Sequence, residues 1–255
     1  MQHDAVATLP QLSLRRPLRA LGALLRSPRW LGGFTTGIAG WGLYIGALAL
    51  APISLVQGVS AGGIGLLALI VQRRRGARLS AREGAAVALS IAGLVLLAAS
   101  LAGGIVSGRT TTTGDVLVWL AVSVVGVAIL TGPVSRALAG GAALGLAAGT
   151  LYAAGDVATK AAVAGDVVLV VAVLASHGAA FAALQLAFQR GGALVTAGLN
   201  TLATNALPIV AGLALYHERV PGGAAGAARL IAFALVVVGA GLLARSGDAP
   251  GPVAA

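Results

Sequence analysis

Few side chains in this chain could carry a proton or bind an ion, and most of those lie in long apolar stretches. Asp156 and Lys160 are four residues apart, so they share one face of a helix. A carboxylate held there by a lysine could couple protons to solute movement. The same spacing also fits a structural ion pair whose lysine reaches the end of its helix. The sequence leaves both interpretations open.

His177 lies in the following apolar stretch and is the second candidate for proton coupling. Imidazole changes its protonation near neutral pH, so a histidine inside a membrane helix can follow a proton gradient. A histidine that only bonds to the carbonyl of a neighbouring helix would give the same pattern. Both roles remain open for His177.

The densest polar pattern lies in residues 193–216. Thr196, Asn200 and Thr204 recur at every fourth position and form one narrow stripe on a helix. Thr201 and Asn205 form a second stripe. Polar groups in hydrocarbon must find partners, and bonds between helices use up one such stripe. Two stripes on one helix therefore predict that Thr196, Asn200 and Thr204 bind a solute.

A weak internal match adds candidates from the first half of the chain. The matched segments are LVQ (55–57) with LVT (194–196), and IAGLVLLA (91–98) with VVGAGLLA (237–244). Self-similar apolar halves are typical of transporters built from repeats, with the solute site between them. Gln57 is then the counterpart of Thr196 and is predicted to bind solute. Trp41 and Tyr44, one span earlier, are predicted to form aromatic walls of that site.

The composition is that of an integral membrane protein. Charged residues make up 9% of the chain and hydrophobic residues 58%, with a mean hydropathy of +0.96, whereas soluble domains average about 25% charged residues. The net charge of +10 is explained by arginines that fix cytoplasmic loops, so no nucleic-acid partner is expected. No phosphate-binding loop, nucleophile triad or metal-ligand cluster is visible. We expect no enzyme activity, no catalytic residue, no metal and no cofactor.

The apolar stretches predict an all-α membrane protein with about eight transmembrane helices, because about 20 residues cross a bilayer. The expected spans are two within residues 30–71, separated by a turn at 51–52, and then 84–104, 116–130, 138–161, a span ending at 188, 193–216 and 224–244. This predicts a cytoplasmic segment (1–29), a first repeat of three spans (30–104), a second repeat of five spans (115–245) and a cytoplasmic tail (246–255).

Orientation follows from the basic residues, which concentrate in cytoplasmic loops. With the N-terminus inside, thirteen of the 17 basic residues fall on the cytoplasmic side, and the bias alternates correctly through all eight spans. We therefore expect a multi-pass protein of the cell membrane with both termini in the cytoplasm. The first three spans match spans six to eight, and this odd shift inverts one repeat relative to the other.

Several helix-end motifs resemble those of the drug/metabolite transporter (EamA-like) superfamily. They are WLGG (30–33), ALALAPISLVQ (47–57), GLVLL (93–97), GTLYAAGDVATK (149–160) and VGAGLL (238–243), with Glu218 in the position of the family's acidic residue. The resemblance implies two inverted five-helix repeats, so this chain looks as if it lacks one or two helices ahead of residue 30. It also implies a similarity to the nine-helix, magnesium-transporter-like NIPA branch.

The resemblance implies a secondary transporter that moves a small organic solute by alternating access. Its partners would be the lipid bilayer, the solute and, for coupling, protons. One alternative is a divalent-cation transporter; magnesium is usually held by one or two carboxylates, and only Asp156 lies within a predicted span. The other alternative is a membrane protein that does not transport, either an assembly partner or a truncated remnant.

Overall fold

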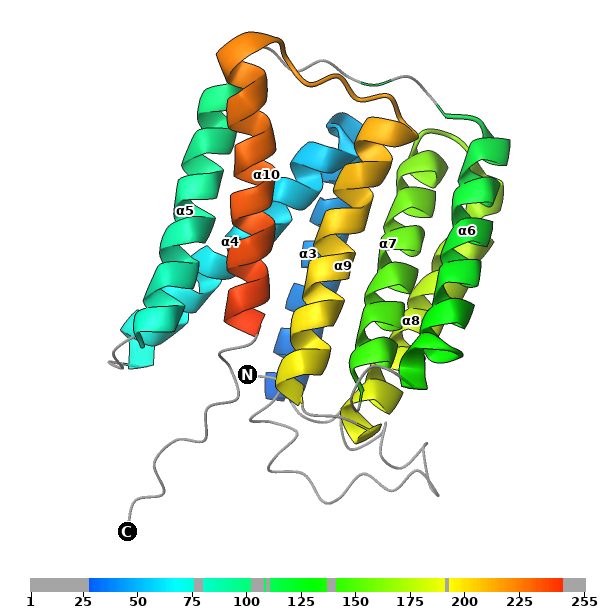
Figure 1. The fold of residues 1–255 in the computed structure, drawn as a ribbon, viewed down its shortest axis with the longest axis horizontal. Helices are drawn as coiled ribbons and strands as arrows, with labels where there is room; N and C mark the ends of the chain where they lie inside the picture. Colours follow the sequence, from blue (N-terminus) through cyan, green and yellow to red (C-terminus); the bar gives the residue numbers. More distant parts are fainter. Residues whose placement is uncertain are drawn as a thin grey trace. The chain divides into compact units, whose positions relative to one another are not determined.

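The structure, a computed structural model, describes residues 28–75, 80–101, 108, 111–136, 141–190 and 193–244. These residues contain eight long α-helices and no strand: α3 (Pro28–Leu50), α4 (Ile53–Arg75), α5 (Ala81–Ser100), α6 (Thr113–Thr131), α7 (Ala142–Val163), α8 (Val170–Arg190), α9 (Ala193–Ala214) and α10 (Gly223–Ala244) (Figure 1). Six helical segments among them are long and apolar enough to cross a membrane. The predicted all-helical, multi-pass character is confirmed at this level.

The chain divides into two compact units, Met1–Ala47 and Leu48–Ala255. The described part of the first unit is most of α3. Trp41 and Tyr44 lie there, with Trp41 exposed and Tyr44 half-buried. These two predicted wall residues belong to the first unit, and all other candidate residues belong to the second.

Local sequence signals explain where the helices begin and end. Pro52 lies between α3 and α4, where it breaks the helix. Ser80 and Glu83 form a capping box at the start of α5, in which each side chain bonds the other residue's backbone N–H. Thr112 and Asp115 form the same device at the start of α6. These signals are local, so the helix positions were predictable to within a few residues.

Within the second unit, the helices that the internal match relates are packed against each other. α4 contacts α9, and α5 contacts α10 along its length. Glycines bring α5 and α10 together: a Cβ on Gly93 would lie 2.6 Å from Val236, and one on Gly239 would lie 2.4 Å from the Ser90 hydroxyl. α7 packs against α6, α8 and α9, so α9 joins the two groups of helices (Figure 1).

The face of α7 that meets α9 is made of glycine. Cβ atoms on Gly145 and Gly149 would lie 2.7 Å from the Thr196 carbonyl oxygen and 2.5 Å from the Asn200 carbonyl oxygen. Such spacings are frequent by chance in a chain with 38 glycines, so sequence reasoning could not single them out. Here they let two helix backbones touch, as small residues do in membrane helix pairs.

Large apolar side chains cover much of the outer surface of the helices. Leu50 is 90% exposed, Val171 74% and Leu174 64%. A soluble protein does not expose so much contiguous apolar surface, whereas lipid tails accept it at no cost. The exposed side chains therefore agree with an embedding in a membrane.

Candidate functional site

Asp156 is the buried centre of a polar cluster that joins three helices. Its carboxylate lies on α7 with 7% of the residue exposed. Gln57 of α4, 2% exposed, donates from its amide nitrogen to Asp156 Oδ2 over 2.9 Å. His177 of α8 brings its Nε2 to 3.6 Å from Asp156 Oδ1. The two predicted coupling residues thus lie together, and Gln57, predicted as a solute ligand, contacts them directly.

The hydrogen bonds of His177 determine which ring nitrogen carries a proton. Nδ1 lies 2.9 Å from the Val173 carbonyl oxygen, one turn earlier on α8. A carbonyl oxygen can only accept, so Nδ1 carries a hydrogen. In neutral imidazole the other nitrogen is then bare, and Nε2 is the nitrogen that faces Asp156.

The contact between Asp156 and His177 brings an acid next to a base. Nε2 and Oδ1 are 3.6 Å apart, which is ion-pair distance but longer than a hydrogen bond. A pair that holds one proton is neutral overall, whichever of the two groups carries it, and so avoids an unpaired buried charge. Gln57 donates to Oδ2, and Oδ1 is the oxygen that faces His177.

Two neighbours on α7 position the imidazole. A Cβ on Gly155 would lie 2.4 Å from both Cε1 and Nδ1 of His177, so the ring occupies the space that the missing side chain leaves. Tyr152 contacts the same ring edge-to-face, with centroids 5.7 Å apart and planes at 70°. Sequence reasoning missed both residues. Their only signal was their position, one residue and one turn before Asp156.

We expect Gly155→Ala to displace His177 and lower stability by about 1–3 kcal/mol, the usual cost of overpacking. Gly178→Ala is the matched control, because Gly178 follows His177 on α8 and a Cβ there would meet nothing within 4 Å. The control should be neutral or slightly stabilising, since alanine favours a helix over glycine by about 1 kcal/mol. Thermal unfolding of both variants in detergent is the measurement. Equal stabilities would show that the ring does not need this space.

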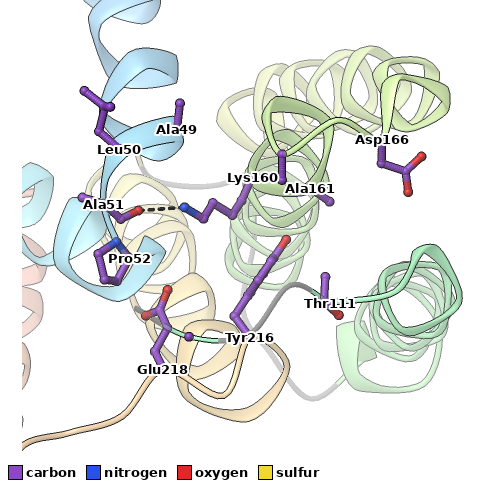
Figure 2. A pocket seen from close by; sticks show the side chains of 12 residues that line it. Ala49, Leu50, Ala51, Pro52, Thr111, Lys160, Ala161, Asp166, Tyr216 and Glu218 are labelled. Carbon is purple, nitrogen blue, oxygen red and sulfur yellow. Dashed lines mark hydrogen bonds between the residues drawn. The ribbon is translucent and has the colours of Figure 1, made fainter. Parts of the chain in front are cut away.

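Lys160 does not pair with Asp156, although both interpretations left open by the sequence join the two residues. Its ammonium donates to the carbonyl oxygens of Leu48 and Ala51, with 2.8 Å to the latter. These carbonyls lie at the C-terminal end of α3, where a cation is favoured by the helix dipole. Figure 2 shows Lys160 extending from α7 to the Ala51 carbonyl. Shared helical spacing was a correct local argument, but a better tertiary acceptor was within reach.

Glu218 performs the complementary role at the start of α4. Its two carboxylate oxygens accept from the backbone N–H groups of Ile53 over 2.5 Å and Ser54 over 3.0 Å. The residue is 7% exposed, and an anion at a helix N-terminus is stabilised by the free N–H groups there. The α3–α4 turn is therefore held from both sides, by a cation on one helix end and an anion on the other.

A cavity of about 270 Å³ lies beside this turn, lined by residues that include Thr111, Lys160, Asp166, Tyr216 and Glu218 (Figure 2). The Tyr216 hydroxyl donates to the Val157 carbonyl oxygen over 2.7 Å. Burial, and then the nearby Glu218 carboxylate, raise the pKa of Tyr216, so this phenol stays protonated.

The backbone conformation between Tyr216 and Glu218 is unusual. His217 has φ = 48°, the left-handed region that non-glycine residues rarely adopt. The turn places Tyr216 and Glu218, both buried, on either side of the exposed His217. Sequence reasoning assigned Glu218 only by resemblance and gave Tyr216 no role.

The predicted solute stripe lies where α9 packs against α7. Thr196 is 0% exposed, and Asn200 and Thr204 are half-buried. In the second stripe, the Asn205 side-chain amide is bonded within α9, because it donates to the Thr201 carbonyl oxygen over 2.8 Å. The first stripe has no such bond, because Thr196 Oγ1, Asn200 Oδ1 and Thr204 Oγ1 are buried without a partner.

A further buried charge lies where α10 packs against α5. Arg229 of α10 donates from Nε to the Ser100 hydroxyl over 3.1 Å and from Nη2 to the Ser100 carbonyl oxygen over 2.9 Å. Ser100 ends α5, so this arginine is a cation at a helix C-terminus, like Lys160. Sequence reasoning assigned Arg229 no role.

The described residues contain no group of three or more side chains suited to hold a metal ion. The structure therefore offers no specific observation in favour of the divalent-cation alternative.

The chain was also compared with known proteins. No protein-family model, no curated protein and no solved structure matches the chain.

Proposed function

We propose that this protein is a secondary transporter of the drug/metabolite type, which moves a small organic solute across the cell membrane and couples that movement to protons. The observation that carries the proposal is the Gln57–Asp156–His177 cluster, in which Gln57 and Asp156 are buried and His177 is half-buried. It is an ionisable pair shared by two helices and tied to a third, in a chain whose helices suit a membrane. Ionisable groups at such positions are expensive and are characteristically used in proton relays.

The chemistry of the cluster suits a proton carrier. The pair is neutral with one proton and carries a negative charge without it, so release of the proton leaves an unpaired charge among buried groups. A helix rearrangement that admits water or a solute would lower that cost. Proton release would then make the helix movement more favourable, and the helix movement would make proton release more favourable. This reciprocal effect is what couples the two processes.

The arrangement of helices supports alternating access between two inverted repeats. α4 packs on α9 and α5 packs on α10, and these are the pairs that the internal sequence match relates. Transporters of this design rock one repeat against the other around a central site. Lys160 bonds to the end of α3, and Glu218 bonds to the start of α4. These contacts would keep the end of the bundle next to the cavity closed in this conformation.

Orientation can be tested with cysteines, because the chain has none of its own. Thr112→Cys should react with an impermeant thiol reagent in intact cells, and Ser80→Cys should react only after the cells are opened. Both residues are exposed helix caps, so the two substitutions cost similar stability. Labelling of Ser80→Cys alone in intact cells would reverse the proposed topology, in which both termini are cytoplasmic.

Transport itself is tested with purified protein in liposomes. A pH gradient is imposed, and accumulation is measured for a panel of labelled sugars, polyols, amino acids and organic cations, with protein-free liposomes as the control. The proposal expects gradient-dependent accumulation of at least one small organic solute. Accumulation of magnesium in place of every organic solute would favour the divalent-cation alternative, and no accumulation at all would favour a protein that does not transport.

A further inference from the structure

Three consecutive turns of α9 carry buried polar atoms that have no hydrogen-bond partner. They are Thr196 Oγ1, Asn200 Oδ1 and Thr204 Oγ1, and in the described part of the chain only two other buried side-chain atoms are in this condition. A buried polar group without a partner is strongly destabilising in hydrocarbon, because no water is present to bond it. Their concentration on one helix face therefore needs an explanation.

Several other helical threonines of the chain show that this condition is avoidable. Hydroxyls of Thr35, Thr131, Thr150 and Thr159 all donate to a carbonyl one turn earlier on their own helix, over 2.8–2.9 Å. That bond is available to any helical threonine. Thr196 and Thr204 do not make it. The Thr196 hydroxyl is instead directed at α7, 2.9 Å from where a Cβ on Gly141 would lie.

Glycines lie opposite these groups. Gly145 and Gly149 of α7 lie against the backbone of Thr196 and Asn200, and Gly141, which precedes α7, lies near the Thr196 hydroxyl. Pro208 adds to the mismatch, because it has no N–H to give the Thr204 carbonyl, as a regular helix would. The seam between α7 and α9 thus holds three unpartnered side-chain atoms on one side and bare backbone on the other.

We propose that the α7–α9 seam is the solute path, closed in this conformation, and that it takes an uncharged solute rich in hydroxyl groups, such as a polyol or a monosaccharide. This inference rests on the proposed transport function and names its substrate class. The groups without a hydrogen-bond partner are two hydroxyls and an amide oxygen, and residues 193–214 contain no charged side chain. A charged solute would find no counter-ion along the stripe, whereas a polyol can both donate to Asn200 Oδ1 and bond both hydroxyls.

The seam also leads to the proton site. Asp156 lies seven residues beyond Gly149 on α7, which is two turns and about 10 Å along the axis on nearly the same side of the helix. Separation of α7 from α9 to admit a solute would therefore disturb the helix that carries the shared proton.

Isosteric substitutions distinguish this role from helix packing. Thr196→Val and Thr204→Val each remove an unpartnered hydroxyl without changing shape, so thermal stability in detergent should rise or stay level. Exchange of labelled xylitol or glucose between liposomes and medium at equal pH should fall about tenfold for each, the value of one hydrogen bond. Thr150→Val is the matched control, since its hydroxyl bonds within α7; it should keep the exchange rate. Unchanged exchange in both seam variants would overturn the proposal.

The reactivity of introduced cysteines gives a second, independent test of the seam. Asn200→Cys should react with a water-soluble maleimide, although the position faces α7 in this conformation, and xylitol should slow the reaction. Val210→Cys is the control: Val210 is 51% exposed on the apolar surface of α9, where lipid would prevent reaction. An unreactive Asn200→Cys would show a seam that never opens.

The outcomes separate this inference from the transport proposal. Exchange at equal pH needs no proton gradient, so it can succeed where coupling fails. If lactate or choline is exchanged and xylitol and glucose are not, the substrate class is wrong while transport stands. If no probe is exchanged by the unaltered protein, the proposed function fails and the seam with it.

Discussion

Asp156→Asn is expected to abolish accumulation of solute driven by a pH gradient, while solute exchange across the membrane continues at a reduced rate. Asparagine keeps the size of the side chain and can still accept from Gln57, but it cannot bind or release a proton. Exchange requires only binding and helix movement. The measurement compares uptake into liposomes with and without a pH gradient, at equal protein content.

Two further variants give this prediction its controls. His177→Gln removes the other half of the shared-proton pair and should reproduce the loss of accumulation. Lys160→Gln should not, because the ammonium bonds to the α3 carbonyls and not to Asp156. If instead Asp156→Asn is unstable and a second change at Lys160 restores normal transport, the two residues form a structural pair and the coupling role is wrong.

Glu218→Leu is expected to cause the largest loss of stability of any single change at the cavity. The buried N–H groups of Ile53 and Ser54 would lose their acceptor, at about 1–3 kcal/mol for each orphaned donor. The cation on Lys160 would also lose an anion that lines the same cavity. Thermal unfolding in detergent measures the effect, with yield of folded protein as a second readout.

Glu218→Gln and Arg219→Gln define the origin of that loss. Glutamine keeps one acceptor oxygen for α4, so its effect should be distinctly smaller than that of leucine. Arg219 is the exposed neighbour in the same loop, and its substitution should change stability by no more than about 0.5 kcal/mol. A Glu218→Leu variant as stable as Arg219→Gln would show that the cap is dispensable.

Local chemistry explains why the helices were predictable from the sequence. Pro52 and the capping boxes that begin at Ser80 and Thr112 act within a few residues, and each ends or starts a helix where expected. The stripe of Thr196, Asn200 and Thr204 also depends only on helical spacing, and the structure places it on one side of α9, against α7. A role as solute ligands stays a prediction.

The tertiary partners could not be read from the sequence. Gln57 reaches Asp156 across 99 residues and Glu218 reaches Ile53 across 165, and no local rule selects such pairs. Lys160 shows the consequence: helical spacing favours Asp156, but the end of another helix offered two carbonyl acceptors. The role of Gly155 could not be predicted either, because it leaves space for the ring of a residue on another helix.

The most direct test concerns the proton shared by Asp156 and His177. The chain has three histidines, so substitution of His3 and His217 leaves a single imidazole for ¹⁵N magnetic resonance in lipid. The account predicts that Nδ1 stays protonated throughout, and that Nε2 shows a pH-dependent change that Asp156→Asn removes over the same pH range. An Nε2 signal that responds to pH identically in the two proteins, or a bare Nδ1, would contradict it.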